Sequence, residues 1–324
     1  MKRKNVWIVL LFLLLLTGCA GESEENPAEE RIVVGISQIG AESDWRVANS
    51  ESMKATFTEE KGYRLLFDDA RQIQENQIMA VRKFIQQKVD YIVLMPLIET
   101  GWDSVLQEAR DAGIPVILVD RQVDVADQEL YAAHVGSDFY AQGQKAVAWM
   151  EKNYRSGTVR IIHIQGTLGS TAQLGRTTAL TQAVEAHSGW DILAQLDGDF
   201  TQAKTYEVMC QYLDAQDEKQ QIDVVYCEND NEAFGAIDAL EERGYVCGKD
   251  VDVICFDATR QALQLCREGK ISLVVECNPL LGPLLEEIIQ AMEQGAIPAK
   301  DNYIDEQVFT REIITDELMA KREY

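Results

Sequence analysis

The chain has 324 residues, of which 46% are hydrophobic. This is enough to bury the cores of two ordinary domains, and it excludes an intrinsically disordered protein. The formal net charge is −24. A surface this negative repels phosphate backbones and anionic lipid headgroups, so we expect neither nucleic-acid binding nor electrostatic docking on a membrane.

The first nineteen residues have the layout of a bacterial export signal. Lys2, Arg3 and Lys4 precede the apolar run 6–16, which is too short to span hydrocarbon because a span needs about 20 residues. The tetrad Leu16-Thr17-Gly18-Cys19 resembles a lipobox. We therefore expect residues 1–18 to be a signal peptide and Cys19 to carry a lipid anchor, with an uncleaved anchor helix or an ordinary signal peptide as the alternatives. The acidic residues 19–30 predict a disordered tether.

The other cysteines all lie in the later part of the chain. They are Cys210, Cys227, Cys247, Cys255, Cys266 and Cys277. An even number in an exported protein permits disulfides, but a chain of this length does not need them. Three of the six end apolar runs, where cysteine commonly serves as a small buried hydrophobe. We expect mostly free, buried thiols. No CxxC spacing indicates a metal or redox site, and we expect no cofactor.

From Arg31 onward, short apolar runs alternate with segments of helical periodicity. The apolar runs are 32–36, 64–67, 91–95, 116–119, 131–135, 159–164, 191–195, 224–227, 251–256 and 271–275. The segments between the early runs, 45–60, 72–87 and 103–112, carry apolar residues three and four apart. This alternation predicts βαβ units with buried parallel sheets. Two such series in succession predict an α/β fold of two doubly wound lobes.

Polar and aromatic side chains follow the predicted strands, where ligands of open parallel sheets bind. The candidates are Glu42, Trp45, Arg46, Asp120, Arg121, Arg176, Phe200, Asn229, Asp257 and Glu276. Each has a simpler explanation. The acids and Asn229 are candidates for helix caps, the arginines for surface ion pairs, and the aromatic residues for core. As a set they favour a binding site, because caps and surface pairs have no reason to fall on one edge of two sheets.

This set of groups suits a neutral polyol. Sugar hydroxyls both donate and accept hydrogen bonds, carboxylates accept them and guanidinium groups donate them. The apolar face of a sugar ring packs on an indole or phenyl ring. Acids and bases in comparable number also pair with one another in a dry cleft, where an unpaired charge is costly.

Several motifs carry a resemblance to a known family. They are VGISQIGAESDWR (34–46), QENQIMAVRKFIQQKVDYI (74–92), PLIETGW (96–102), IPVILVDRQVDV (114–125), IQGTLGS (164–170), DGDFTQAKTYEVM (197–209), END (228–230) and CFDATR (255–260). The chain resembles the type I periplasmic sugar-binding proteins of ABC transporters, of the ribose-binding type, and within that family its galactofuranose-binding members. Gly175 before Arg176, and Asp44, depart from the common pattern.

The resemblance implies three crossovers between the lobes, near Gly136-Ser137, Glu276-Cys277 and Asn302-Tyr303. The first lobe would comprise 31–136 with 277–302, and the second 137–276 with 303–324. It assigns sugar contacts to the ten candidates above, with Glu42 the weakest assignment and Glu276 at a crossover. It further implies a monomeric, extracytoplasmic receptor that binds a monosaccharide, galactofuranose or a related aldose, and delivers it to an ABC permease.

Three rival functions follow from the same residues. Asp120, Asp257 and Glu276 are candidates for the paired carboxylates of a glycosidase, but we expect neighbouring arginines to hold them ionised, which suits a general acid poorly. We therefore do not expect an enzyme. A cytosolic regulator with the same lobes would need an N-terminal helix-turn-helix in place of the export signal. A receptor feeding a sensor kinase or chemoreceptor remains an alternative to a transporter component.

Overall fold

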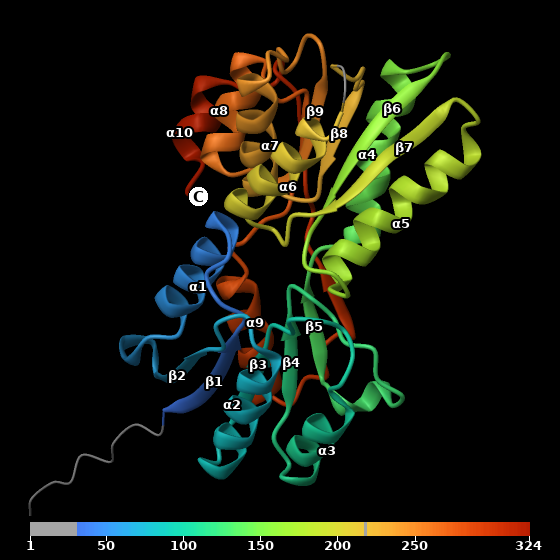
Figure 1. Ribbon diagram of the computed structural model, residues 1–324. Helices are drawn as coiled ribbons and strands as arrows, with labels where there is room; N and C mark the ends of the chain where they lie inside the picture. The colour runs from blue at the N-terminus through green and yellow to red at the C-terminus, as the bar shows by residue number, and fades with distance from the viewer. Residues whose placement is uncertain (1–30, 217–218) are drawn as a thin grey trace, which may run out of the picture. The chain divides into compact units, whose positions relative to one another are not determined.

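The computed structural model describes residues 31–216 and 219–324. The predicted signal peptide, the predicted lipid attachment at Cys19 and the predicted acidic tether lie outside the described residues. Within Arg31–Tyr324 the strands form two six-stranded sheets (Figure 1). This confirms the predicted α/β fold of two parallel-sheet lobes. No helix in the described ranges is long and apolar enough to cross a membrane.

The first sheet has the strand order β11-β5-β4-β3-β1-β2, and every pairing in it is parallel. Its strands are β1 (Ile32–Gln38), β2 (Tyr63–Asp69), β3 (Tyr91–Leu94), β4 (Val116–Val119), β5 (Ala133–Gly136) and β11 (Asp301–Tyr303). Its helices are α1 (Asp44–Thr56), α2 (Gln74–Gln86), α3 (Asp103–Asp111) and α9 (Gly282–Glu293), with short 3-10 turns η1 (Glu59–Lys61) and η2 (Gln128–Leu130).

The second sheet has the order β12-β10-β9-β8-β6-β7, and β12 runs antiparallel to β10 at its edge. Its strands are β6 (Val159–Gln165), β7 (Trp190–Asp197), β8 (Val224–Cys227), β9 (Asp252–Asp257), β10 (Leu273–Glu276) and β12 (Val308–Phe309). Its helices are α4 (Phe139–Asn153), α5 (Thr171–Ala186), α6 (Gln202–Asp214), α7 (Asp230–Glu242), α8 (Arg260–Glu268) and α10 (Asp316–Lys321).

Both sheets are buried on both faces, which is why their strands read as nearly continuous apolar runs. In β3, for example, Ile92 and Leu94 pack on the side of α2 and α3, whereas Val93 packs on the side of α1 and α9. The second sheet likewise has a core toward α6, α7 and α8 and another toward α4 and α5. Five of the six later cysteines are buried, and all six are free thiols.

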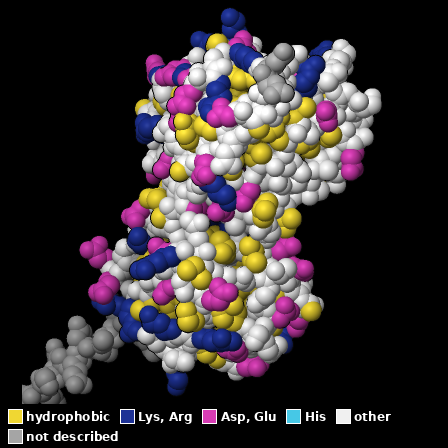
Figure 2. Space-filling model, in the orientation of Figure 1, with side chains coloured by type: hydrophobic (Ala, Val, Ile, Leu, Met, Phe, Trp, Pro, Cys, Tyr) yellow, Lys and Arg dark blue, Asp and Glu magenta, His cyan; other side chains and the backbone are white. Residues whose placement is uncertain are grey.

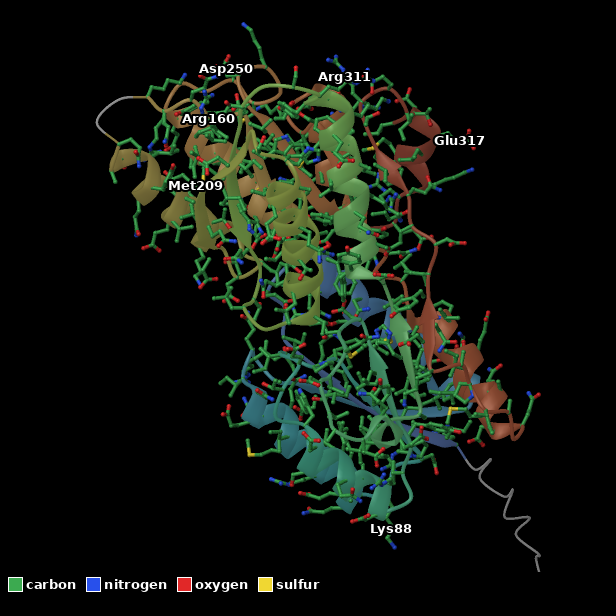
Figure 3. All side chains as sticks on the ribbon, turned by 90° about the vertical axis from the view of Figure 1, so that its right-hand side faces the viewer. Lys88, Arg160, Met209, Asp250, Arg311 and Glu317 are labelled. Atoms are coloured by element: carbon green, nitrogen blue, oxygen red, sulfur yellow. The ribbon has the colours of Figure 1, made fainter. Side chains whose placement is uncertain are left out.

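The chain passes between the sheets three times, after β5, after β10 and between β11 and β12. The carboxyl ends of the strands in both lobes therefore face the crossovers. The amino ends lie far from them: Lys88, just before β3, and Arg160 and Asp250, near the starts of β6 and β9, mark the opposite ends of the two lobes (Figure 3). Acidic and basic side chains are interspersed on the face that Figure 2 shows, rather than gathered into a basic patch.

One predicted helix ends earlier than its periodicity indicated. The pattern 45–60 predicted a single helix, but α1 ends at Thr56 and Phe57 begins the turn that leads into η1. Gly62, with φ of 85°, then closes η1 in the left-handed conformation that glycine adopts without strain. The buried Phe57 ring packs edge-on against Tyr63 at 5.0 Å, so tertiary packing overrides the helical pattern here.

Candidate functional site

Nine of the ten predicted site residues line one cavity at the carboxyl ends of both sheets. The lining residues are Glu42, Ser43, Trp45, Arg46, Asp120, Arg121, Phe139, Ala172, Arg176, Phe200, Asn229, Asp257 and Cys277. The space between these side chains has about 20 Å³ open to the centre of a water-sized sphere, which is room for about one water molecule. The lining side chains therefore nearly fill the space between the strand ends of the two lobes.

Arg46 lies between two carboxylates in the first lobe. Its Nε donates to Glu42 Oε1 at 2.9 Å and its Nη2 to Asp120 Oδ2 at 2.7 Å, and all three side chains are at least 95% buried. Burial opposes the charge on Arg46, but Asp120 and Glu42 outweigh it and raise its pKa. Ser43 caps α1 by accepting from the Arg46 amide, so Arg46 stands in the first turn, beside the strand ends.

Arg121 is a second fully buried guanidinium with fewer partners. Its Nη1 donates to the Leu97 carbonyl at 2.7 Å, its Nε is 3.9 Å from Asp120 Oδ2, and its plane lies 5.3 Å from the centre of the Phe200 ring. Burial, and then repulsion from Arg46, lower the pKa of Arg121 to about 10. This charge lacks the close carboxylate that Arg46 has, so a ligand oxygen would stabilise it.

Arg176 occupies the corresponding position in the second lobe. Its Nε and Nη2 donate to Gln142 Oε1 at 3.1 and 2.8 Å, and its Nη1 donates to the Glu228 carbonyl. Asp257 Oδ1 lies 3.8 Å from Arg176 Nη2, too far for a direct hydrogen bond. Burial therefore prevails over Arg176 and raises the pKa of Asp257 well above its usual range. The expectation that neighbouring arginines hold these carboxylates ionised therefore meets an opposing effect at Asp257, where burial outweighs Arg176.

Apolar groups complete the walls of the cavity. Trp45, Phe139, Ala172, Phe200 and Cys277 form one buried cluster. The Trp45 indole is fixed by its Nε1 donating to the Cys277 carbonyl at 2.7 Å. The Phe200 ring fits only because residue 166 is glycine: a Cβ there would stand 2.0 Å from the ring. These rings offer the flat apolar surface that a sugar ring or similar alicycle packs against.

Three of the cavity residues hold strained backbone conformations. The φ angles of Asp120, Phe200 and Asp257 are 66°, 59° and 103°, in a region that non-glycine residues rarely adopt. Such strain costs on the order of 1–3 kcal/mol per residue and clusters where function requires a particular side-chain direction. It points these side chains into the cavity at the expense of stability.

Several polar atoms on the cavity side chains have no hydrogen-bond partner among the described residues. They are Arg46 Nη1, Arg121 Nε and Glu42 Oε2, and each is buried. Leaving a buried donor or acceptor unpaired costs about 1–3 kcal/mol, and more for a charged group. Asn229, by contrast, is engaged: its Oδ1 caps α7 at Glu232 N, 2.8 Å away, and its Nδ2 donates to the Phe200 carbonyl. The unpaired set of two donors and one acceptor matches a hydroxylated ligand.

Glu276 is the predicted site residue that the structure places elsewhere. Its carboxylate receives Arg322 Nη1 at 2.7 Å and the Gln307 amide at 2.9 Å, so it ties the C-terminal segment to the crossover after β10. A buried acid after an apolar strand needs a partner, and for Glu276 that partner is Arg322, near the chain end. Glu276 therefore lies outside the cavity that the other nine predicted residues line.

Four lining residues were missed by the sequence argument: Ser43, Phe139, Ala172 and Cys277. The chain positions of two of these residues could have identified them from the sequence. Phe139 begins α4 directly after the Asp138 cap that follows the first crossover, and Cys277 directly follows β10. Both stand where the chain leaves a sheet. The described residues contain no cluster of His, Cys, Asp and Glu side chains placed to hold a metal ion.

We predict that mild acidification stabilises the ligand-free protein through Asp230. Burial raises the pKa of this carboxyl, which begins α7, to about 7. Between its unfolded pKa and that value only the folded state holds the proton, so stability falls as pH rises through this window. Lowering the pH from about 7.5 to about 5 should raise the melting temperature. Asp230→Asn, which cannot titrate, should show a smaller rise in the same thermal melts, and an equal rise would contradict the assignment.

Comparisons with known proteins agree with this geometry. A profile of the periplasmic binding protein domain family matches residues 34–296. The galactofuranose-binding protein of Escherichia coli (strain K12) is 32% identical over 96% of this chain and 98% of its own length. The binding component of the arabinose ABC transporter from Shewanella sp. ANA-3, solved with arabinofuranose, is 38% identical, covers 90% of this chain and 95% of its own, and superposes with a TM-score of 0.84.

A protein of Mycobacterium smegmatis solved with β-D-fucofuranose is 39% identical, covers 87% of this chain and 92% of its own, and superposes with a TM-score of 0.82. The matches span both lobes and both sides of the cavity between them. The chain therefore belongs to the periplasmic binding protein domain family.

Proposed function

We propose that the protein is an extracytoplasmic receptor that binds one furanose sugar, galactofuranose or a related aldose, in the cavity between its lobes, for an ABC importer. The observation that carries this proposal is the unpaired, buried set of Arg46, Arg121 and Glu42 atoms beside apolar rings. The hydroxyls of a sugar bond such unpaired polar atoms, and the C–H face of its ring packs on apolar rings. Three relatives are named or were solved with furanose sugars, which supports this ring form.

The proposed mechanism is closure of the lobes on the sugar. Arg46, Asp120 and Arg121 would bind it from the first lobe, and Arg176, Asn229 and Asp257 from the second. Because the sugar then contacts both halves, it has higher affinity for the closed state and shifts the population toward it. The closed form would present a single surface to the permease.

Contacts at the rim of the cavity join the lobes in this closed arrangement. The Asp44 amide donates to Asn231 Oδ1 at 3.1 Å, and Asn231 Nδ2 donates back to Asp44 Oδ2 at 3.3 Å. On the other side, the Glu99 amide donates to the Gly169 carbonyl at 3.0 Å. Asp44, which departs from the common family pattern, therefore has a role as half of a reciprocal latch.

We predict that Asn231→Ala weakens sugar binding modestly by removing this latch. Two partly exposed hydrogen bonds, each worth roughly 0.5–1 kcal/mol, correspond to about a five- to thirty-fold loss of affinity, expressed mainly as faster release of the sugar. Stopped-flow fluorescence would measure the rates. Gln211→Ala is a matched control, because its amide bonds Glu207 within α6 alone. Equal release rates for both variants would show that the latch contributes nothing.

Membrane attachment through Cys19 and delivery to a permease complete the proposal. The lipobox-like tetrad supports the first, and the Shewanella relative, named as a transporter component, supports the second. We propose binding without chemistry. Turnover of aryl furanosides by the purified protein would contradict that, and it is worth assaying because burial raises the pKa of Asp257 in the cavity.

Isothermal titration calorimetry against galactofuranose, arabinose, ribose, galactose and glucose tests the proposed function. We expect one site per chain and the tightest binding for a sugar presented as a furanose. Absence of heat across the whole panel would refute the monosaccharide proposal. Preference for the pyranose of glucose would refute the furanose assignment alone.

A further inference from the structure

All three crossovers between the lobes converge on one carboxylate that does not line the cavity. Glu306 lies in the third crossover. Its Oε1 accepts from Ser137 Oγ at 2.6 Å in the first crossover and from the Asn278 amide at 3.0 Å in the second. Lys145 Nζ, on α4, donates to its backbone carbonyl at 2.9 Å. A single half-buried acid thus joins the segments about which the lobes would rotate.

Gln142, on α4, connects this carboxylate to the cavity. Its Nε2 donates to Glu306 Oε2 at 2.6 Å and to the Glu276 carbonyl at 3.1 Å, while its Oε1 accepts both bonds from Arg176. A guanidinium only donates and a carboxylate only accepts, so the amide has a single orientation that satisfies both neighbours. The hydrogen bonds therefore run in one direction, from Arg176 as donor through Gln142 to Glu306 as the final acceptor.

We infer that Glu306 is a positioning residue: through Gln142 it sets the orientation of the ligand arginine Arg176 and couples it to the three crossovers. This inference rests on the proposed function, in which Arg176 contacts the sugar. The Gln142 amide has four polar contacts among the described residues, two at each end. A change in the direction of Arg176 Nε or Nη2 therefore alters the bonds of Gln142.

The coupling has a physical consequence for substitution of the acid. In Glu306→Gln the new amide has one acceptor oxygen in place of two, so either Ser137 and Asn278 or Gln142 loses its acceptor. If Gln142 rotates to recover a bond, its Nε2 faces Arg176, donor against donor. Keeping the single oxygen toward Ser137 and Asn278 preserves two bonds rather than one, so Gln142 is the group that loses its acceptor, and Arg176 is displaced although its own environment in the cavity is untouched.

The test is a double-mutant cycle in the full chain, read out by calorimetry with the tightest-binding sugar. Glu306→Gln should weaken binding about ten-fold or more in the wild-type background, and less than about two-fold when Gln142 is already replaced in Gln142→Met. Asp252→Asn is the matched control. Asp252 lies at the start of β9, the end opposite the cavity, and its carboxylate accepts a hydrogen bond from Ser272 Oγ at 2.5 Å. This substitution also removes one carboxylate charge, and it should leave sugar affinity unchanged.

A second readout does not depend on the sugar. The Arg176 Nε–H resonance in the ¹⁵N NMR spectrum of the sugar-free protein, identified by its loss in Arg176→Lys, should shift in Glu306→Gln and stay in place in Asp252→Asn. Equal affinity losses in both backgrounds, or an unmoved resonance, would overturn the inference. If the wild type binds no sugar, the proposed function fails and the resonance alone decides the coupling.

Discussion

Arg46→Met should abolish sugar binding and markedly destabilise the fold. Glu42 and Asp120 are each within 3 Å of Arg46 and at least 95% buried, and the substitution leaves these two charges facing the single guanidinium of Arg121, 3.9 Å from Asp120. Breaking a buried pair by removing one partner costs about 3–5 kcal/mol. We expect that loss in the free energy of unfolding from urea denaturation, and at least a ~1,000-fold loss of sugar affinity by calorimetry.

Arg82→Met is the matched control for this prediction. Arg82 on α2 also makes a two-pronged pair, with Glu108 at 2.8 and 2.9 Å, but both side chains are exposed. Exposed pairs contribute little to stability, so this variant should bind and unfold like the wild type. If the free energy of unfolding of Arg46→Met equalled that of Arg82→Met, Arg46 would not be the group that offsets the charges of Glu42 and Asp120.

Arg121→Met should have the opposite effect on stability while also abolishing binding. Burial and repulsion from Arg46 lower the pKa of Arg121 to about 10. The folded protein therefore disfavours the charge on this guanidinium. Its folded pKa lies below the unfolded one, so below about pH 10 the charge lowers stability, by a cost on the order of 3 kcal/mol. An apolar side chain of similar length removes that cost.

We therefore expect the sugar-free Arg121→Met protein to melt at or above the wild-type temperature, with sugar affinity reduced at least ~100-fold because a charge-assisted donor is lost. Differential scanning calorimetry with and without sugar measures both. Retained affinity would show that the cavity is not the binding site. Marked destabilisation would show that the bond to the Leu97 carbonyl outweighs the burial cost of the charge.

The sequence was sufficient to predict the lobes and most of the cavity. The strands are buried on both faces, so their apolar runs are conspicuous, and polar residues directly after them must lie at one sheet edge. That argument found Asp120, Asn229 and Asp257 from chain position alone. It also found Arg46, because a residue in the first turn of a helix stays close to the preceding strand end.

What could not be predicted depends on contacts between distant parts of the chain. Glu276 looks like a ligand group until Arg322, 46 residues later, is placed beside it. Gln142 looks like an ordinary helical residue until Arg176 and Glu306 approach it from two sides. The raised pKa of Asp257 likewise depends on a distance of 3.8 Å to Arg176 that no spacing in the sequence encodes.

A crystal structure of the mature domain with its tightest-binding sugar tests the central claim most directly. We expect a single furanose ring between Trp45 and Phe200, with hydroxyls within hydrogen-bond distance of Arg46 Nη1, Arg121 Nε and Glu42 Oε2, the atoms that lack partners among the described residues. A sugar bound elsewhere, or bound here with those three atoms still unpaired, would contradict the account.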